Sequence, residues 1–95
     1  MEDGPKLTPE AMRAARALLG LPTVEAAARI GISATTLNQI EAGAPIRPST
    51  VRKVAVGLAQ LGVEILSEDG WTGARIHLTR GASPPTARED TASGA

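Results

Sequence analysis

The stretch TVEAAARIGISATTLNQIEAG, residues 23–43, decides the fold of this chain. Its pattern predicts one helix over residues 23–30, a turn at Gly31 and a second helix over residues 33–42. Gly31 has no Cβ, so it can take the left-handed conformation that ends a helix and redirects the chain. Ser33 then stands where an N-cap is needed, because its hydroxyl can accept a hydrogen bond from an unpaired backbone N–H. The stretch therefore predicts two short helices that cross at a tight turn.

Small and apolar side chains fall where such a crossing needs them. Ala27, four residues before the glycine, is small enough to let the second helix lie close across the first. The apolar side chains that would hold the two helices together are Ala26, Ile30, Ile32, Leu37 and Ile40. This arrangement is a helix-turn-helix, and its second helix is suited to enter the major groove of DNA.

A further helix is predicted before this motif, from about Pro9 to Leu19. Thr8 is suited to be its N-cap, a proline occupies the first helical position, and Glu10 stands in the first turn. One helical face carries the apolar residues Ala11, Met12, Ala15, Leu18 and Leu19. Gly20 follows as the residue that ends the helix.

A fourth helix is predicted after the motif. Residues 43–48 contain a glycine and two prolines, which makes them a loop. Ser49 or Thr50 can cap the helix that follows, and Gly62 can stop it. The residues expected to form its buried stripe are Val51, Val54, Ala55, Leu58 and Leu61.

The spacing of apolar residues changes after Gly62, and two strands are predicted there. Residues 63–66 are a short β-prone run, and residues 67–70, SEDG, have the composition of a turn. Residues 74–80 alternate, with Ala74, Ile76 and Leu78 on one face and polar side chains on the other. We expect an antiparallel hairpin.

The predicted fold is mainly α, with four helices and a C-terminal β-hairpin. A chain of 95 residues has room for a single domain. We expect a flexible leader over residues 1–7, the helix-turn-helix domain over 8–62 and the hairpin over 63–80. Residues 81–95 have no large apolar side chain, so we expect a disordered tail.

Composition excludes several functional classes. The chain has no cysteine, which rules out a disulfide framework and a thiolate metal site. It has no Gly-rich phosphate loop, no metal-ligand cluster and no nucleophile beside a base, and His77 is its only histidine. We therefore expect neither an enzyme nor a bound cofactor. The N-terminus lacks the features of a signal peptide, and no apolar run reaches the roughly 20 residues of a membrane span, so a cytoplasmic protein without a membrane partner is expected.

The charge is unevenly distributed. The formal net charge is +0, but residues 6–53 hold seven basic and three acidic side chains, a local net charge of +4. A basic helical body is compatible with contact to phosphates, although this signal is weaker than in a strongly basic DNA-binding domain.

The segment LLGLPTVEAAARIGISATTLNQIEAG, residues 18–43, followed by RPSTVRKVAVGLAQLGVEIL, residues 47–66, resembles the phage-repressor-like (Xre/Cro) helix-turn-helix family. The resemblance covers about residues 8–80. More specifically, the chain resembles small bacterial members of the family in which four helices are followed by two strands. It implies a lambda-repressor-like fold and a DNA-binding transcriptional regulator.

The resemblance also implies roles for individual side chains. The positions that match base-reading residues are Ala34, Thr35, Asn38 and Gln39. Of these, Gln39 can pair bidentately with adenine. The positions that match phosphate contacts are Thr23, Ser33, Arg47, Ser49, Thr50 and Arg52. Arg16 and Glu41 match a partly buried salt bridge between the first helix and the end of the second helix of the motif.

The chain also departs from the family pattern. Many relatives have Ser-Gln at the entry to the motif, where this chain has Pro22 and Thr23. Ala26 stands where leucine is common, and Ala34 stands where a basic residue or glutamine is frequent. The second helix of the motif therefore carries no positive charge, and specificity would depend on few base contacts together with DNA shape.

We expect a regulator, in the simplest case a repressor, that binds double-stranded DNA as a homodimer on a two-fold-related operator. The hairpin is the expected dimerisation element, because its apolar face needs a cover and its edge has unpaired backbone groups. The expected interface residues are Val63, Ile65, Trp71, Ala74, Ile76 and Leu78. Trp71 would pack at the junction of hairpin and helices, as a core or interface anchor.

Two alternatives remain open from the sequence. The helix-turn-helix could be the scaffold of a protein-interaction module, such as an antiactivator or antitoxin-like partner, in which the uncharged helix docks on protein. The hairpin could instead be a wing that contacts the minor groove through Arg75 and Arg80, although Ile76 and Leu78 argue for burial. Steep salt dependence of binding would favour DNA over a protein partner.

Overall fold

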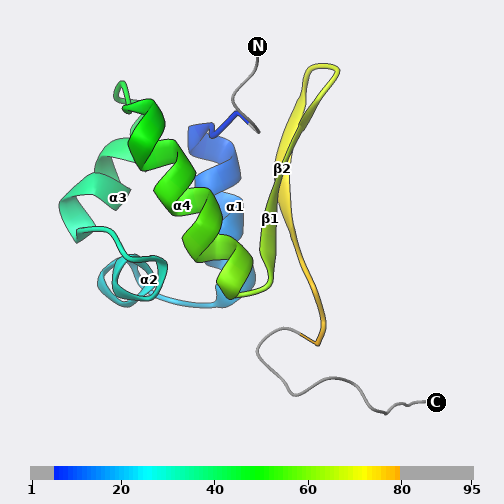
Figure 1. Cartoon of the computed structure of the whole chain (residues 1–95), viewed down its shortest axis with the longest axis horizontal. Coiled ribbons are helices and arrows are strands. Elements are labelled where there is room, and N and C mark those ends of the chain that lie inside the picture. Colours follow the sequence, from blue (N-terminus) through cyan, green and yellow to red (C-terminus); the bar gives the residue numbers. More distant parts are fainter. Residues whose placement is uncertain (1–5, 80–95) are drawn as a thin grey trace.

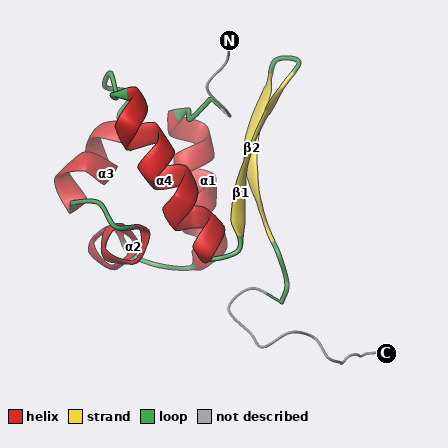
Figure 2. Ribbon diagram, viewed as in Figure 1, coloured by secondary structure: helices red, strands yellow, loops and turns green. Residues whose placement is uncertain are grey.

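The computed structural model describes residues 6–79, in which four helices are followed by an antiparallel hairpin (Figures 1 and 2). The elements are α1 (Pro9–Leu19), α2 (Thr23–Ile30), α3 (Ala34–Glu41), α4 (Pro48–Gln60), β1 (Val63–Glu68) and β2 (Trp71–Ile76). Figure 1 shows α3 on one side of the helical body and the hairpin on the other, with α1 and α4 between them. The predicted mainly α fold with a C-terminal hairpin is confirmed.

The helix ends follow most of the predicted caps. Thr8 Oγ1 accepts a hydrogen bond from the N–H of Ala11 at 3.0 Å, and Ser33 Oγ accepts one from the N–H of Thr36 at 3.0 Å. Gly31 ends α2 in the left-handed region, with a φ of 98°. The turn of the helix-turn-helix is therefore built as the sequence predicts.

The start of α4 differs from the prediction. Arg47 is its N-cap and Pro48 occupies the first helical position, so neither Ser49 nor Thr50 is the cap. Proline is favoured there because its missing N–H would have no partner in the first turn and its φ already suits a helix. Pro48, which the sequence pattern assigns to the loop, is thus the first residue of the helix.

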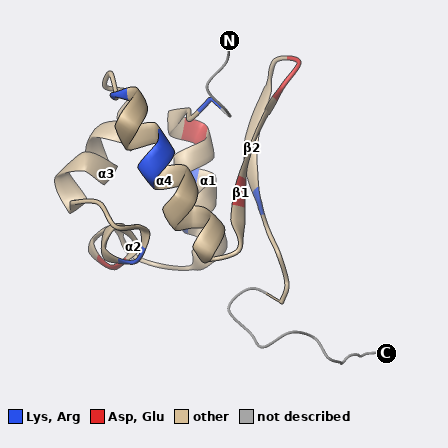
Figure 3. Ribbon diagram, in the orientation of Figure 1, with Lys and Arg blue, Asp and Glu red and all other residues tan. Residues whose placement is uncertain are grey.

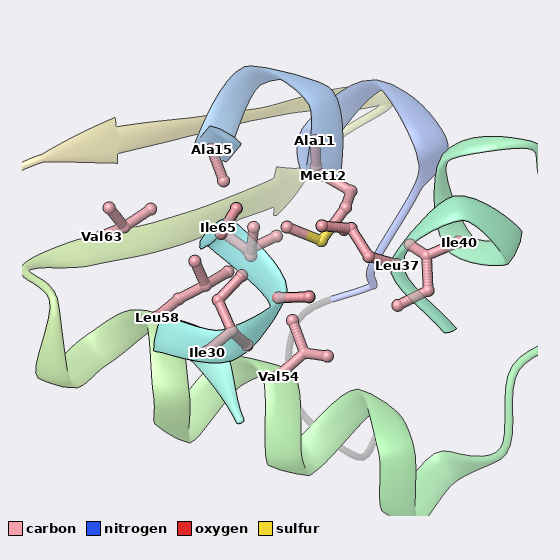
Figure 4. Close-up of a cluster of buried hydrophobic side chains, with 12 residues drawn as sticks. Ala11, Met12, Ala15, Ile30, Leu37, Ile40, Val54, Leu58, Val63 and Ile65 are labelled. Carbon is pink, nitrogen blue, oxygen red and sulfur yellow. The ribbon is translucent and has the colours of Figure 1, made fainter. Parts of the chain in front are cut away.

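An aliphatic core lies among the helices and β1 (Figure 4). Its buried side chains are Ala11, Met12, Ala15, Ala26, Ala27, Ile30, Leu37, Ile40, Val54, Leu58, Val63 and Ile65. Most of the predicted apolar faces are therefore correct. The prediction was wrong for Leu18, which is exposed, and it was only partly correct for α4, where Val51 and Ala55 are half-buried.

Helices α2 and α4 approach each other very closely at Gly57, which is buried. A Cβ at this position would lie 2.1 Å from the carbonyl oxygen of Ile30. Non-bonded heavy atoms make favourable contacts only near 3.5 to 4.0 Å, so any side chain here would push the helices apart. The apolar pattern of α4 does not mark this residue, because a glycine contributes no side chain to the pattern.

The hairpin has the predicted antiparallel pairing but a shorter turn. Residues 63–68 pair in register with residues 71–76. Only Asp69 and Gly70 form the turn, with φ values of 52° and 84°. Two-residue turns with positive φ match the natural twist of the strands, so Ser67 stays in the ladder instead of joining the turn.

The second strand is also shifted relative to the prediction. It begins at Trp71 and ends at Ile76, whereas residues 74–80 were expected. Leu78 lies beyond the strand and is 88% exposed, so it does not extend the apolar face of Ala74 and Ile76.

The chain ends are described only in part. Leu7 packs against the core, so the predicted leader is wrong at this residue. Residues 1–5 and 80–95, which include the rest of the leader, Arg80 and the predicted tail, lie outside the described residues. None of the helices within residues 6–79 is long and apolar enough to cross a membrane.

Candidate nucleic-acid interface

Helix α3 lies on the side of the molecule away from the hairpin and has a polar face (Figure 1). Its exposed side chains include Thr35, Asn38 and Gln39. They are spaced three and four residues apart and so share one side of the helix. Leu37 and Ile40 lie on the other side, in the core. Ala34 is half-buried and packs against the core, which makes it the least accessible of the four predicted base-reading residues.

The position of α3 is fixed by an ion pair with α1. Arg16 Nε donates to Glu41 Oε2 at 2.7 Å, and Arg16 Nη2 donates to Glu41 Oε1 at 3.0 Å. The two side chains are 29% and 14% exposed, so the pair is partly screened from water. The hydrogen bonds that Arg16 donates to Glu41, with a smaller contribution from the charge of Glu41, raise the pKa of the Arg16 guanidinium above its usual value, although burial acts in the opposite direction. The predicted Arg16–Glu41 bridge is thus present.

A second arginine of α1 contacts the same end of α3. Arg13 Nη1 donates to the backbone carbonyl oxygen of Glu41 at 2.7 Å. Carbonyl groups at a helix C-terminus have no partner within the helix, and a cation there is stabilised by the helix dipole. The sequence pattern places Arg13 only on the water side of α1. Its spacing of three residues from Arg16 was the signal that both could reach one helix end.

The basic surface near α3 comes from α4 and the loop before it. Arg47, Arg52 and Lys53 are exposed there, and α4 contains no acidic residue (Figure 3). Because Arg13 and Arg16 are engaged with Glu41, these three cations carry most of the positive charge available beside the polar face. Three of the seven basic residues in the segment 6–53 therefore lie on the N-terminal half of α4 or in the loop before it.

The predicted phosphate contacts fall into two groups. Five of them stand in or next to the first turns of two helices: Thr23 on α2, and Arg47, Ser49, Thr50 and Arg52 on or before α4. Neither of these helices has a side-chain cap bond, so unpaired N–H groups remain at both N-termini. Ser33 differs, because its hydroxyl also donates to Thr36 Oγ1 at 2.9 Å. Ser33 is thus engaged in capping α3.

The predicted dimer residues do not form one surface. Val63 and Ile65 are buried in the chain's own core, and Ala74 and Ile76 pack against it from β2. Helices α1 and α4 contact the strands and cover this face. The expectation that the apolar face needs a second chain as its cover was wrong, because the helices of the same chain already bury it.

Trp71 lies on the opposite face of the hairpin. It pairs with Glu68 next to the turn and is 78% exposed, so it does not pack at the junction with the helices. Arg75, the described member of the pair suggested for a wing, donates from Nε to Glu64 Oε1 at 2.7 Å. Within residues 6–79 no group of three histidine, aspartate or glutamate side chains could hold a metal ion.

Comparison with known families gives a match to the Helix-turn-helix family model over residues 12–63. The chain belongs to this family. The matched residues run from α1 to the first residue of β1 and contain the polar face of α3, its anchors and the basic start of α4. The resemblance to Xre/Cro-like members is confirmed at the level of family, and the family is one of DNA-binding transcription regulators. Comparisons with curated proteins and with solved structures gave no match.

Proposed function

We propose that this protein is a sequence-specific repressor that binds a two-fold-related operator as a homodimer and reads it with α3. The observation that carries this proposal is the exposed, uncharged polar face of α3, which Arg13 and Arg16 hold at one end of the helix. Side chains must keep a fixed position to read base edges, and a helix held by packing and by charged hydrogen bonds supplies it.

Gln39 is the residue best suited to select a base. It is exposed on α3, and its amide can donate to and accept from one adenine in the major groove. Asn38 has the same chemistry, whereas Thr35 offers a hydroxyl or a methyl contact with thymine. Since Ala34 is half-buried, base selection would depend mainly on the other three.

Affinity would come mainly from phosphate contacts at the starts of α2 and α4. Arg47 and Arg52 supply charge, while Thr23, Ser49 and Thr50 supply hydroxyl groups beside unpaired N–H groups. These contacts fix the register of the protein on the duplex without carrying sequence information. Binding should therefore weaken steeply as the salt concentration rises.

A homodimer would compensate for the small size of each reading head. Two linked heads that engage two half-sites gain affinity through effective concentration, without any new base contact. Their α3 helices should lie a whole number of DNA turns apart, each turn being about 34 Å. Repression is the simplest outcome, since occupation of an operator needs no further contact surface.

Binding to the DNA upstream of the protein's own coding sequence tests this proposal. Wild-type protein should protect a two-fold-related site, and log affinity should fall with log salt at about −0.9 per phosphate neutralised. Gln39→Ala should lose most of its preference for that site, about 1 to 3 kcal/mol in discrimination, while binding to unrelated DNA persists. Arg47→Ala should weaken binding to both kinds of DNA and reduce the salt slope by about one phosphate.

Gln60→Ala is a matched control for Gln39→Ala. It also removes an exposed glutamine, but at the C-terminal end of α4, away from the predicted DNA contacts. It should leave affinity, preference and salt slope unchanged. If wild-type protein binds no DNA at low salt, or binds with no salt dependence, the proposal fails and a protein-docking role for the scaffold becomes the better reading.

A further inference from the structure

The hairpin has an outer face that no other part of residues 6–79 covers. Side chains of directly paired residues in an antiparallel ladder point to the same side. By the observed register, the outer face consists of Glu64, Leu66, Glu68, Trp71, Gly73 and Arg75. The contact between Thr72 Oγ1 and Thr8 Oγ1, at 2.6 Å, shows that the neighbour of Trp71 faces the helical body.

An apolar patch occupies the middle and one end of this outer face. Trp71 is the protein's only aromatic residue, yet it is 78% exposed while aliphatic side chains form the core. Leu66, paired with Gly73 beside it, is 39% exposed. Exposed tryptophan next to an exposed leucine is typical of a contact surface, since large aromatics are enriched in the buried centres of interfaces.

Gly73 leaves a hollow in this patch. A Cβ built there would have no heavy atom within 4 Å, so the space above it is empty. Trp71 and Arg75 stand two residues before and after Gly73 on the same face, so this open space lies between the positions of their side chains. The hollow lies opposite Leu66, an apolar side chain that is itself partly exposed.

The charges of the outer face are complementary across the two strands. β1 contributes Glu64 and β2 contributes Arg75, directly opposite each other and both more than 60% exposed. If a second copy faces the first about a two-fold axis parallel to the strands, β1 of each copy lies over β2 of the other. Each Glu64 then meets an arginine, and each Leu66 meets the hollow above a glycine.

We propose that the outer faces of two hairpins pack together in this way and form the dimer. Leu66 of each copy enters the hollow between the partner's Trp71 and the partner's Arg75, and Glu64 of each copy pairs with the partner's Arg75. A buried tryptophan typically removes about 150 to 250 Å² from water, and the symmetry supplies two of them. The arrangement rests on the proposed homodimer and leaves both α3 faces uncovered, because α3 lies on the far side of the helical body (Figure 1).

Sedimentation of the purified full chain tests the role of Trp71. Wild-type protein should dimerise at micromolar concentration, and Trp71→Ala should weaken dimerisation at least about 30-fold, as expected for an aromatic anchor. The fluorescence of wild-type protein comes from Trp71 alone, since the chain has no tyrosine. Its emission should shift to shorter wavelengths as dimers form. Val24→Ala, which trims an exposed apolar residue of α2, should change neither result.

A charge exchange tests the arrangement itself. Arg75→Glu and Glu64→Arg should each be monomeric, because two like charges would face two like charges across the axis. An equimolar mixture of the two variants should form a heterodimer, since every acid then faces a base. The double variant Glu64→Arg/Arg75→Glu should dimerise like wild type. Circular dichroism of each variant should show unchanged helix content.

Three results would overturn this inference: a wild-type monomer at all concentrations, a dimer in which the Trp71 emission stays that of a water-exposed indole, or a mixture of charge variants that remains monomeric. These measurements contain no DNA, so their failure is distinct from failure of the proposed function. In the reverse case, a Trp71-dependent dimer that binds no DNA would refute the repressor and leave the dimer surface standing. Monomeric Trp71→Ala should still bind a single half-site in a salt-dependent way.

Discussion

The exposed face of α3 and the outer face of the hairpin lie on opposite sides of the helical body. They differ in polarity and in the contacts that fix their position. The α3 face is polar and uncharged, and α1 fixes its end through Arg13 and Arg16. The hairpin face is apolar around Trp71, and the Thr8–Thr72 hydroxyl pair links the hairpin to the start of α1 near its tip.

This difference separates two kinds of recognition. A face that reads bases needs polar side chains in fixed positions, because each hydrogen bond must reach a particular base edge. A face that joins two copies of a protein gains most from apolar area and shape, because burial of a tryptophan is favourable in many orientations. The helical body lies between the two faces, so a substitution in the body should impair both DNA binding and dimerisation. A substitution at one face should impair only the function of that face.

The largest effect is expected in the body, at Gly57. Gly57→Ala places a methyl group against the carbonyl oxygen of Ile30 and forces α2 and α4 apart. We expect a loss of about 3 kcal/mol, at the upper end of the range for overpacked cores, and a melting temperature lower by about 12 to 24 °C. Thermal melts followed by circular dichroism measure it, and both DNA binding and dimerisation should weaken.

The reverse substitution is the control for Gly57. Ala28→Gly removes a methyl group from an exposed position of α2 and should cost only about 1 kcal/mol, through helix propensity. If Gly57→Ala is instead neutral or stabilising, the close approach of α2 and α4 is not a constraint on the fold.

The next effect is expected at the α3 end. Glu41→Ala leaves Arg16 without its carboxylate partner in a partly buried position. We expect a loss of about 1 to 3 kcal/mol, together with weaker sequence preference in DNA binding, while dimerisation stays unchanged. Chemical denaturation and DNA titrations of the same preparations measure the two effects.

Glu25→Ala is the matched control for Glu41. It breaks an exposed pair with Arg29, whose closest charged atoms are 3.8 Å apart, and should cost no more than about 0.5 kcal/mol. Equal losses from Glu41→Ala and Glu25→Ala would mean that the bridge to α1 does not hold α3 in place.

The smallest effect is expected at the hairpin end. Thr8→Val removes the cap of α1 and the contact with the Thr72 hydroxyl, which should cost about 1 kcal/mol. Hydrogen exchange of the β2 amides should become faster, whereas that of the α3 amides should not change. Thr8→Ser keeps the hydroxyl and should behave like wild type. Faster exchange in α3 to the same extent would show that the two ends are not independent.

Much of the fold could be predicted from the sequence because local chemistry specifies it. A glycine at the turn, hydroxyl caps such as Thr8 and Ser33, and apolar residues at helical spacing each act over a few residues. The helix-turn-helix and its flanking helices therefore appear in the structure nearly where the sequence places them. The strand bounds were less accurate, because a two-residue turn with positive φ let the pairing run up to the tip.

The parts of the site that could be predicted are those that depend on the position of a residue within one helix. Thr35, Asn38 and Gln39 are exposed because Leu37 and Ile40, between and beside them, are buried. The bond from Arg13 to the carbonyl of Glu41 could not be predicted in this way. It joins residues 28 positions apart, and its acceptor is a backbone carbonyl oxygen, which every residue has and which the sequence therefore cannot single out.

The sequence by itself determined that two short helices meet at Gly31 and that α3 turns a polar face to solvent, because both follow from backbone geometry within one segment. Only the tertiary structure decided which face of the hairpin is covered. From the sequence, Val63 and Ile65 could equally have been buried by a partner chain. In the structure α1 and α4 pack against them, and Trp71 is exposed to solvent. Alternation along a strand defines two faces, and only the packing of distant helices determines which of them water reaches.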